Sequence, residues 1–124
     1  MIKFLNLVIG GAAGTIARYL LSGAAHRFLG TNFPFGTLIV NICGCFILGI
    51  LATFSGKKFM LEPEARILLM IGFCGAFTTF STLIFETDIL VREGQAIRAF
   101  VNVFGSIILG FILFRVGSLL GEII

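Results

Sequence analysis

Four apolar stretches, each long enough to cross a lipid bilayer as a helix, take up most of this 124-residue chain. Crossing a hydrocarbon core of roughly 30 Å takes about 20 apolar residues in an α-helix. The stretches are predicted at about 4–23, 36–55, 66–90 and 96–120. Hydrophobic residues make up 58% of the chain and charged residues 12%, which is typical of a membrane protein. We therefore expect a single all-α transmembrane domain with both termini on one side of the bilayer.

If Arg115, which lies inside the fourth predicted span, is left aside, basic residues are evenly divided between the two ends of these predicted helices. Lys3, Lys57, Lys58 and Arg66 lie on the side of the termini, and Arg18, Arg27, Arg92 and Arg98 lie on the opposite side. Membrane orientation follows a Lys/Arg excess in the short cytoplasmic loops, and here neither side has one. Either another feature sets the orientation, or the chain inserts both ways up and pairs with an inverted copy of itself. Charges spread in this way give no reason to expect a nucleic-acid partner, despite a net charge of +3.

The third apolar stretch contains a segment rich in glycine and hydroxyl residues, Gly72–Thr82. An unpaired polar group in lipid costs several kcal/mol, so such a segment is expected only where it lines a cavity or meets another protein surface. Gly72 and Gly75 weaken the helix. A break between Gly75 and Thr78 would free carbonyl oxygens at membrane depth, as in discontinuous transporter helices that coordinate a monovalent cation. This segment is the first candidate for the functional site.

Beyond the predicted break, polar side chains follow one face of the helix. At about 100° per residue, Thr79, Thr82 and Glu86 share that face, and Phe80 lies about 100° from Thr79. The stripe fits either a water-lined path or hydrogen bonds between helices. A ring edge is the positive part of the aromatic quadrupole, so Phe80 can present an electropositive edge to an anion. An alternative function is a proton-coupled small transporter that uses Glu86 as its proton carrier.

Further polar residues lie within the other predicted spans. Arg18 lies near the end of the first span, where it either reaches the interface or faces an aqueous vestibule and raises the local anion concentration. Asn41 carries the only amide side chain of the second span, and its NH2 group either bonds a neighbouring helix or donates to a passing anion. In the fourth span, Ser106 follows Asn102 by one turn on the same face.

Small residues at four-residue spacing predict close contact between helices. Gly10 and Gly14 have this spacing in the first span, and Gly117 and Gly121 have it in the fourth. The three cysteines fall within predicted spans and are expected to pack as buried thiols. A zinc site is not expected, because the only histidine, His26, is predicted to lie in a loop. The sequence also offers no nucleophile with an accompanying base, no metal cluster and no phosphate loop, which gives little support to an enzyme function.

Three motifs, taken in order along the chain, carry a family resemblance. They are Gly10–Gly14 followed by Arg18 and Tyr19, then Phe35–Asn41, then Gly72–Thr82. Together with the length and the four spans, they resemble the CrcB/Fluc family of fluoride channels over essentially the whole chain. The resemblance implies an antiparallel dual-topology homodimer with two fluoride pores at its interface. It also implies passive export of fluoride across the cell membrane of a bacterium or archaeon, which lowers fluoride toxicity.

The resemblance further implies roles for individual residues. Backbone carbonyls of Gly75 and Thr78 from both subunits would hold a structural sodium ion at the dimer centre. Leu83 departs from the family pattern, because it stands where the motif has a second phenylalanine, three residues after Phe80. We therefore expect conduction with altered fluoride occupancy. The implied pore residues are Arg18, Asn41, Phe80, Ser81, Thr82 and Ser106.

Overall fold

The computed structural model describes residues 1–56 and 61–124, and that part of the chain is helical with short connections. Its elements are α1 (Ile2–Leu29), α2 (Phe35–Gly56), α3 (Pro63–Arg66), η1 (Ile67–Cys74), α4 (Gly75–Phe77), α5 (Phe80–Arg92) and α6 (Ala96–Ile123). Elements α3, η1, α4 and α5 together form one interrupted span. Within the described residues, four spans are long and apolar enough to cross a membrane, which confirms the predicted all-α four-span fold with a broken third span. Lys57 and Lys58, used above to compare the two ends, lie outside the described residues.

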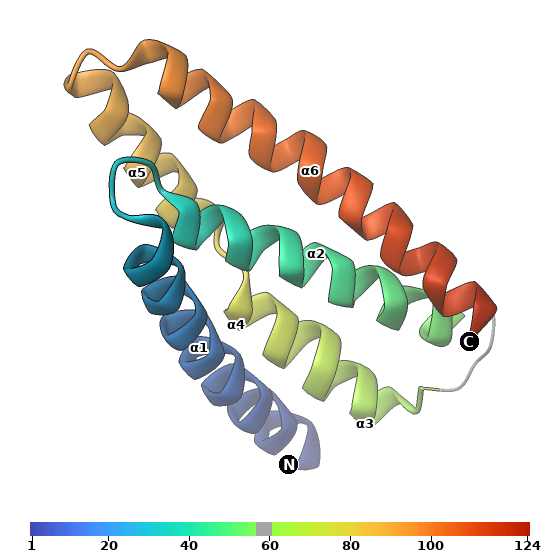
Figure 1. The fold of residues 1–124 in the computed structure, drawn as a ribbon. Helices are drawn as coiled ribbons and strands as arrows, with labels where there is room; N and C mark the ends of the chain where they lie inside the picture. The colour runs from blue at the N-terminus through green and yellow to red at the C-terminus, as the bar shows by residue number, and fades with distance from the viewer. Residues whose placement is uncertain (57–60) are drawn as a thin grey trace.

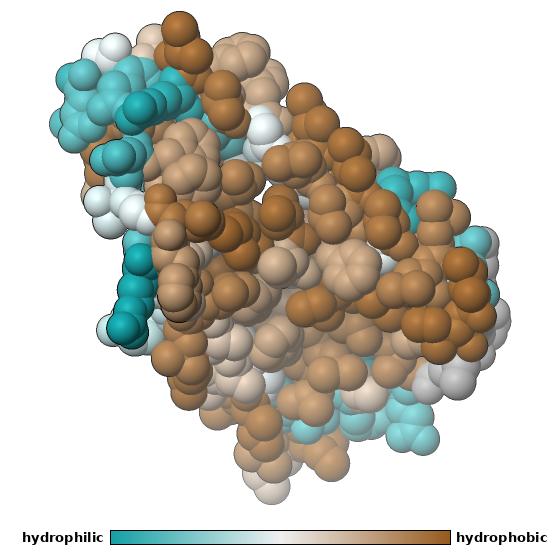
Figure 2. Space-filling model, in the orientation of Figure 1, coloured by the Kyte–Doolittle hydropathy of each residue, from teal (hydrophilic) through white to brown (hydrophobic). Residues whose placement is uncertain are grey.

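The four spans run side by side, and their connections alternate between two ends (Figure 1). Both termini and the start of α3 lie toward one end, and the α1–α2 and α5–α6 connections lie toward the other. Hydrophobic residues cover the middle of the face in Figure 2, and most hydrophilic ones gather near its ends. Large apolar side chains such as Phe4 and Phe111 are exposed on α1 and α6. This distribution suits a surface surrounded by lipid.

Helix α1 continues past its predicted end at Gly23 as far as Leu29. Ala24 and Ala25 favour a continued helix. The helix ends at Gly30, whose φ of 83° is readily adopted only by a residue without a Cβ atom. His26 therefore lies in the last turn of α1, and its predicted loop position is wrong.

Helix α1 packs directly against η1, which is a π-helix. A Cβ atom at Gly10 would collide with the carbonyl oxygen of Leu68, and one at Gly14 would collide with that of Phe73. The small residues of α1 therefore allow contact between backbones, as their spacing predicts. Short π-helical segments are rare and frequently occur at functional sites. Here η1 leads directly into the break of the third span.

Helices α2 and α6 form a second close contact, the α2–α6 seam, which includes Gly49, Thr53, Gly117 and Ser118. A Cβ atom at Gly117 would collide with the carbonyl oxygen of Phe46. Thr53 is buried, and its Oγ1 lies 3.1 Å from both the carbonyl oxygen and the Oγ of Ser118. The seam combines contact between backbones with satisfied hydroxyl groups.

Candidate functional site

The third span is interrupted at Thr78 and Thr79, whose backbones are extended. Their ψ angles are 157° and 119°. Helix α4 ends at Phe77 and α5 begins at Phe80. Gly75 is itself helical, with φ of −63° and ψ of −36°, so the break begins only at Thr78, the last residue of the predicted interval. The break lies at this position because a side chain of another span bonds the backbone of Thr79.

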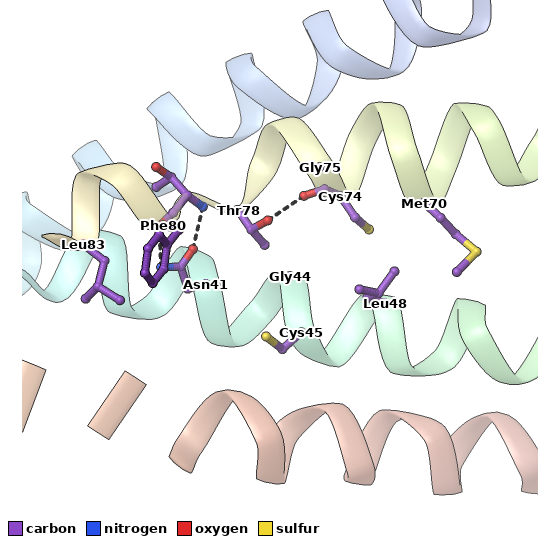
Figure 3. A pocket seen from close by; sticks show the side chains of 11 residues that line it. Asn41, Gly44, Cys45, Leu48, Met70, Cys74, Gly75, Thr78, Phe80 and Leu83 are labelled. Carbon is purple, nitrogen blue, oxygen red and sulfur yellow. Dashed lines mark hydrogen bonds between the residues drawn. The ribbon is translucent and has the colours of Figure 1, made fainter. Parts of the chain in front are cut away.

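Asn41 of α2 holds the backbone at the break (Figure 3). Its Oδ1 accepts a hydrogen bond from the N–H of Thr79 at 2.7 Å, and its Nδ2 donates to the carbonyl of Thr79 at 2.9 Å. One side chain therefore satisfies both backbone groups of a residue 38 positions away. This contact matches the first of the two interpretations for Asn41, a bond to a neighbouring helix. The second proton on Nδ2 is available for another acceptor.

The break diverts two N–H groups from their helical acceptors. In an uninterrupted helix, Thr79 would donate to the carbonyl of Gly75, and Thr82 would donate to that of Thr78. The N–H of Thr79 instead bonds Asn41, and the N–H of Thr82 bonds Oγ1 of Thr79 at 3.3 Å. Gly75 and Thr78 thus lose the helical donors to their carbonyl oxygens. Such oxygens suit a hard cation such as sodium, so this pair fits the ligand set implied by the resemblance.

A cavity of about 290 Å³, here called the break cavity, lies beside this interruption (Figure 3). Asn41, Gly75 and Thr78 contribute to its wall, together with Phe80 and Leu83. The Phe80 residue is 72% exposed, whereas Leu83 is 4% exposed. Leu83, which stands where the family motif has a second phenylalanine, therefore lies in the wall of the same cavity as Phe80.

A second cavity of about 410 Å³, here called the hydroxyl cavity, lies between α1, α2 and α5. Thr79, Thr82 and Glu86 line it together, as the predicted stripe requires, and Arg18 lines it from α1. Thr79 lies in the walls of both cavities. Thr37 also contributes to this wall, although it was not among the predicted pore residues. Its place in the motif before Asn41 was the available signal.

Hydrogen bonds connect the polar groups of the hydroxyl cavity. Thr79 Oγ1 donates to Thr82 Oγ1 at 3.0 Å, and Thr37 Oγ1 donates to Glu86 Oε1 at 2.8 Å. Glu86 Oε2 is buried without a hydrogen-bond partner in the described part of the chain. Ser81 lines neither the hydroxyl cavity nor the break cavity; it is exposed, and its Oγ lies 3.5 Å from Oγ1 of Thr79. The cavity wall thus holds hydroxyls, a carboxylate and a guanidinium.

Ser106 lines neither of these two cavities. It is buried on α6, and its Oγ has no hydrogen-bond partner among the described residues. One turn earlier, Asn102 is fully buried and donates to Oγ1 of Thr87 at 3.0 Å. The structure therefore brings Asn41 and Phe80 to the break cavity, Arg18 and Thr82 to the hydroxyl cavity, and Ser106 to a separate place on α6.

Comparison with known proteins gives the family. The model of the CrcB-like protein family, described as camphor resistance (CrcB), matches residues 5–118. The chain belongs to the CrcB family. The fluoride-specific ion channel FluC of Maridesulfovibrio salexigens is 44% identical to this CrcB-family chain over 124 residues, which cover 100% of the chain and 98% of the relative. The fluoride-specific ion channel FluC of Chlorobaculum tepidum is 46% identical over 114 residues, which cover 92% of the chain and 90% of the relative.

These findings also place the protein in the cell. Four spans of sufficient length and hydropathy, together with bacterial channel relatives, make this CrcB-family chain a multi-pass protein of the cell membrane. Ion channels move ions without chemical catalysis, and the family is therefore not a class of enzymes.

Proposed function

We propose that this CrcB-family chain forms a fluoride-selective channel through which fluoride leaves the cell passively, lowering fluoride toxicity. Relatives named fluoride-specific ion channels, similar over nearly their whole length, support the proposal. The structural observation that carries it is the hydroxyl cavity, which meets the break cavity at Thr79. It offers several hydrogen-bond donors and one cationic side chain, Arg18, between three spans that are otherwise largely apolar.

The proposed mechanism follows from the chemistry of a small, strongly hydrated anion. A pore must replace the water donors around fluoride without holding the ion too tightly, and several weak sites do so better than one strong site. Arg18 raises the local anion concentration at the hydroxyl cavity. The hydroxyls of Thr82 and Ser81 and the second Nδ2 proton of Asn41 then donate to the ion in turn. The edge of the Phe80 ring adds a weakly positive surface beside the path.

An antiparallel homodimer is part of the proposal. The exposed ring of Phe80 beside the break gives a second copy an apolar surface to cover. A twofold axis at the break would bring together two copies of the Gly75 and Thr78 carbonyls, and so supply a four-oxygen ligand set from two chains. A sodium ion held there supplies fixed positive charge near the anion path. Ser106 would complete the polar lining from α6.

Fluoride efflux from proteoliposomes, followed with a fluoride electrode, tests the proposed function. We expect rapid loss of fluoride and retention of chloride in matched vesicles. Absence of fluoride efflux, or chloride efflux at an equal rate, would contradict the proposal. Labelling an engineered terminal cysteine from each side of the membrane tests dual insertion, because exclusive labelling from one side excludes it.

The buried, unpartnered Oε2 of Glu86 supports one second candidate, a proton-coupled transporter. A channel only dissipates a fluoride gradient, whereas a coupled transporter uses a proton gradient to accumulate its substrate. Under the transporter hypothesis, Glu86→Gln abolishes transport and no accumulation remains. Under the channel hypothesis, the variant still conducts, and an imposed proton gradient does not drive accumulation in the native protein.

A further inference from the structure

Two titratable side chains, His26 of α1 and Glu86 of α5, lie at the boundary between two cavities. Both line the hydroxyl cavity, and both line a neighbouring cavity of about 220 Å³. This third cavity, here called the outer cavity, includes Thr31 of the α1–α2 connection and Glu93 of the α5–α6 connection. It therefore extends from the hydroxyl cavity toward one end of the spans. An ion that passes between the two cavities passes His26 and Glu86.

Each of these two side chains has a buried polar atom with unmet hydrogen-bonding capacity. In the described chain, His26 Nδ1 and Glu86 Oε2 have no hydrogen-bond partner. Buried polar atoms are usually paired, and exceptions often mark a functional site. The other carboxylate oxygen, Oε1, accepts a hydrogen bond from Oγ1 of Thr37 at 2.8 Å.

The imidazole ring lies close to the backbone of α2. A Cβ atom built on Gly36 would collide with Oγ of Ser22 and would lie 2.7 Å from Nε2 of His26, so the missing Cβ atom leaves room for both side chains. Helix α1 reaches this level because it continues past Gly23 to Leu29. The ring is therefore held against α2, in the wall of both cavities.

We propose that His26, which lines the same two cavities as Glu86, is a proton-sensitive residue of the anion path and makes conduction increase as the pH falls. The inference rests on the proposed channel function. An ionised Glu86 places a negative charge where fluoride must pass, and this charge repels the anion. A protonated His26 neutralises that charge locally and adds an N–H donor. The proton thus changes the electrostatic barrier between the hydroxyl cavity and the outer cavity.

Other ionisable groups face the same two cavities. Arg18 and Tyr19 line the hydroxyl cavity from α1, and Glu93 lines the outer cavity beyond α5. Helix α2 adds the neutral Thr37. Among the types of side chain present, imidazole is the one whose charge ordinarily changes between about pH 5 and pH 8. A Glu93→Gln variant shows whether Glu93 contributes to the pH dependence of the fluoride current.

Fluoride currents across planar bilayers test the proposal, because the neutral hydrogen fluoride that crosses lipid at low pH carries no current. We expect the current of the native channel to rise by roughly fivefold between about pH 8 and pH 5.5. His26→Gln should conduct with a pH-independent current, and Glu93→Gln should keep the native pH dependence. Arg27→Gln is the matched control, since this exposed neighbour on α1 lines neither cavity and should also keep the dependence.

A current that does not change with pH in the native channel, or that keeps its pH dependence in His26→Gln, would overturn the inference while leaving the channel function intact. Absence of any fluoride current would instead contradict the channel function. Because His26 is the only histidine in the chain, its ring can also be titrated by NMR without conduction. A ring whose charge does not change between about pH 8 and pH 5.5 would also overturn the inference.

Discussion

The α2–α6 seam and the hydroxyl cavity both place hydroxyl groups inside an apolar bundle, and they treat those groups differently. In the seam, buried Thr53 lies within hydrogen-bond distance of two oxygen atoms of Ser118, and the backbones touch. In the hydroxyl cavity, Thr79 and Thr82 bond each other beside open space, and Glu86 keeps an unpartnered oxygen. The hydroxyl groups of the seam are hydrogen-bonded to each other and to the backbone. Those that face the hydroxyl cavity can still form a hydrogen bond with another ligand.

Gly117→Ala should break the seam and have the largest effect on stability. The added Cβ atom collides with the backbone carbonyl of Phe46, so the two helices must separate. We expect a loss of about 3 kcal/mol in the free energy of unfolding. Reversible unfolding in mixed detergent micelles measures it. Gly105→Ala is the control on the same helix, because its nearest non-backbone neighbour lies 4.0 Å away and it should not destabilise the protein.

Asn41→Asp should produce the largest loss of transport at the break. A carboxylate keeps the acceptor for the N–H of Thr79 but loses the donor to its carbonyl, which it then faces with negative charge. We expect fluoride efflux roughly thirtyfold slower, corresponding to about 2 kcal/mol. Asn6→Asp is a matched control, because Asn6 bonds the backbone of Glu64 in α3. Equal losses in both variants would remove Asn41 from the site.

Thr82→Ala and Thr53→Ala compare the cavity with the seam directly. Thr82→Ala should slow fluoride efflux about fivefold, because one hydrogen bond to the ion is worth about 1 kcal/mol. It leaves the Thr79 cap in place, since the backbone N–H of residue 82 makes that bond. Thr53→Ala should instead lower the free energy of unfolding by about 1 kcal/mol with unchanged efflux. Reversed outcomes in efflux and unfolding assays would contradict the distinction.

Thr78→Ser should have the smallest effect. A serine keeps the hydroxyl that donates to the carbonyl of Cys74 at 2.9 Å, and the backbone carbonyl proposed for sodium is unchanged. Only the methyl group that contacts Gly44 is lost. We expect unchanged fluoride efflux and sodium dependence, with less than about 1 kcal/mol lost in the free energy of unfolding. A shift in the sodium concentration that supports efflux would argue against a site made of backbone carbonyls.

Hydropathy was sufficient to predict the spans, because each membrane helix must satisfy its own backbone. The spacing of Gly10 and Gly14 likewise predicted contact between backbones. The position of the break was harder to predict from the sequence. Weak helix-forming residues indicated Gly75, but the interruption begins at Thr78 because Asn41 bonds Thr79 across the bundle. Local propensity contains no information on such a tertiary contact.

The candidate site shows the same limit. Helical periodicity correctly grouped Thr79, Thr82 and Glu86, since they share one helix. It did not show that Thr37 bonds Glu86, because that hydroxyl belongs to another span. Because α1 was expected to end at Gly23, His26 was not expected in the last turns of this helix, where it lines the hydroxyl cavity.

The two bonds between Asn41 and Thr79 have a consequence for assembly. A primary amide offers one donor and one acceptor side by side, the same pair that an adjacent β-strand would offer to an extended residue. The interruption is thus a one-residue strand whose partner is a side chain of the same subunit. Both bonds lie within one chain, so the interruption does not require a second chain. In the proposed homodimer, association would join two surfaces in which the break is already formed, and no helix would have to be unwound in lipid.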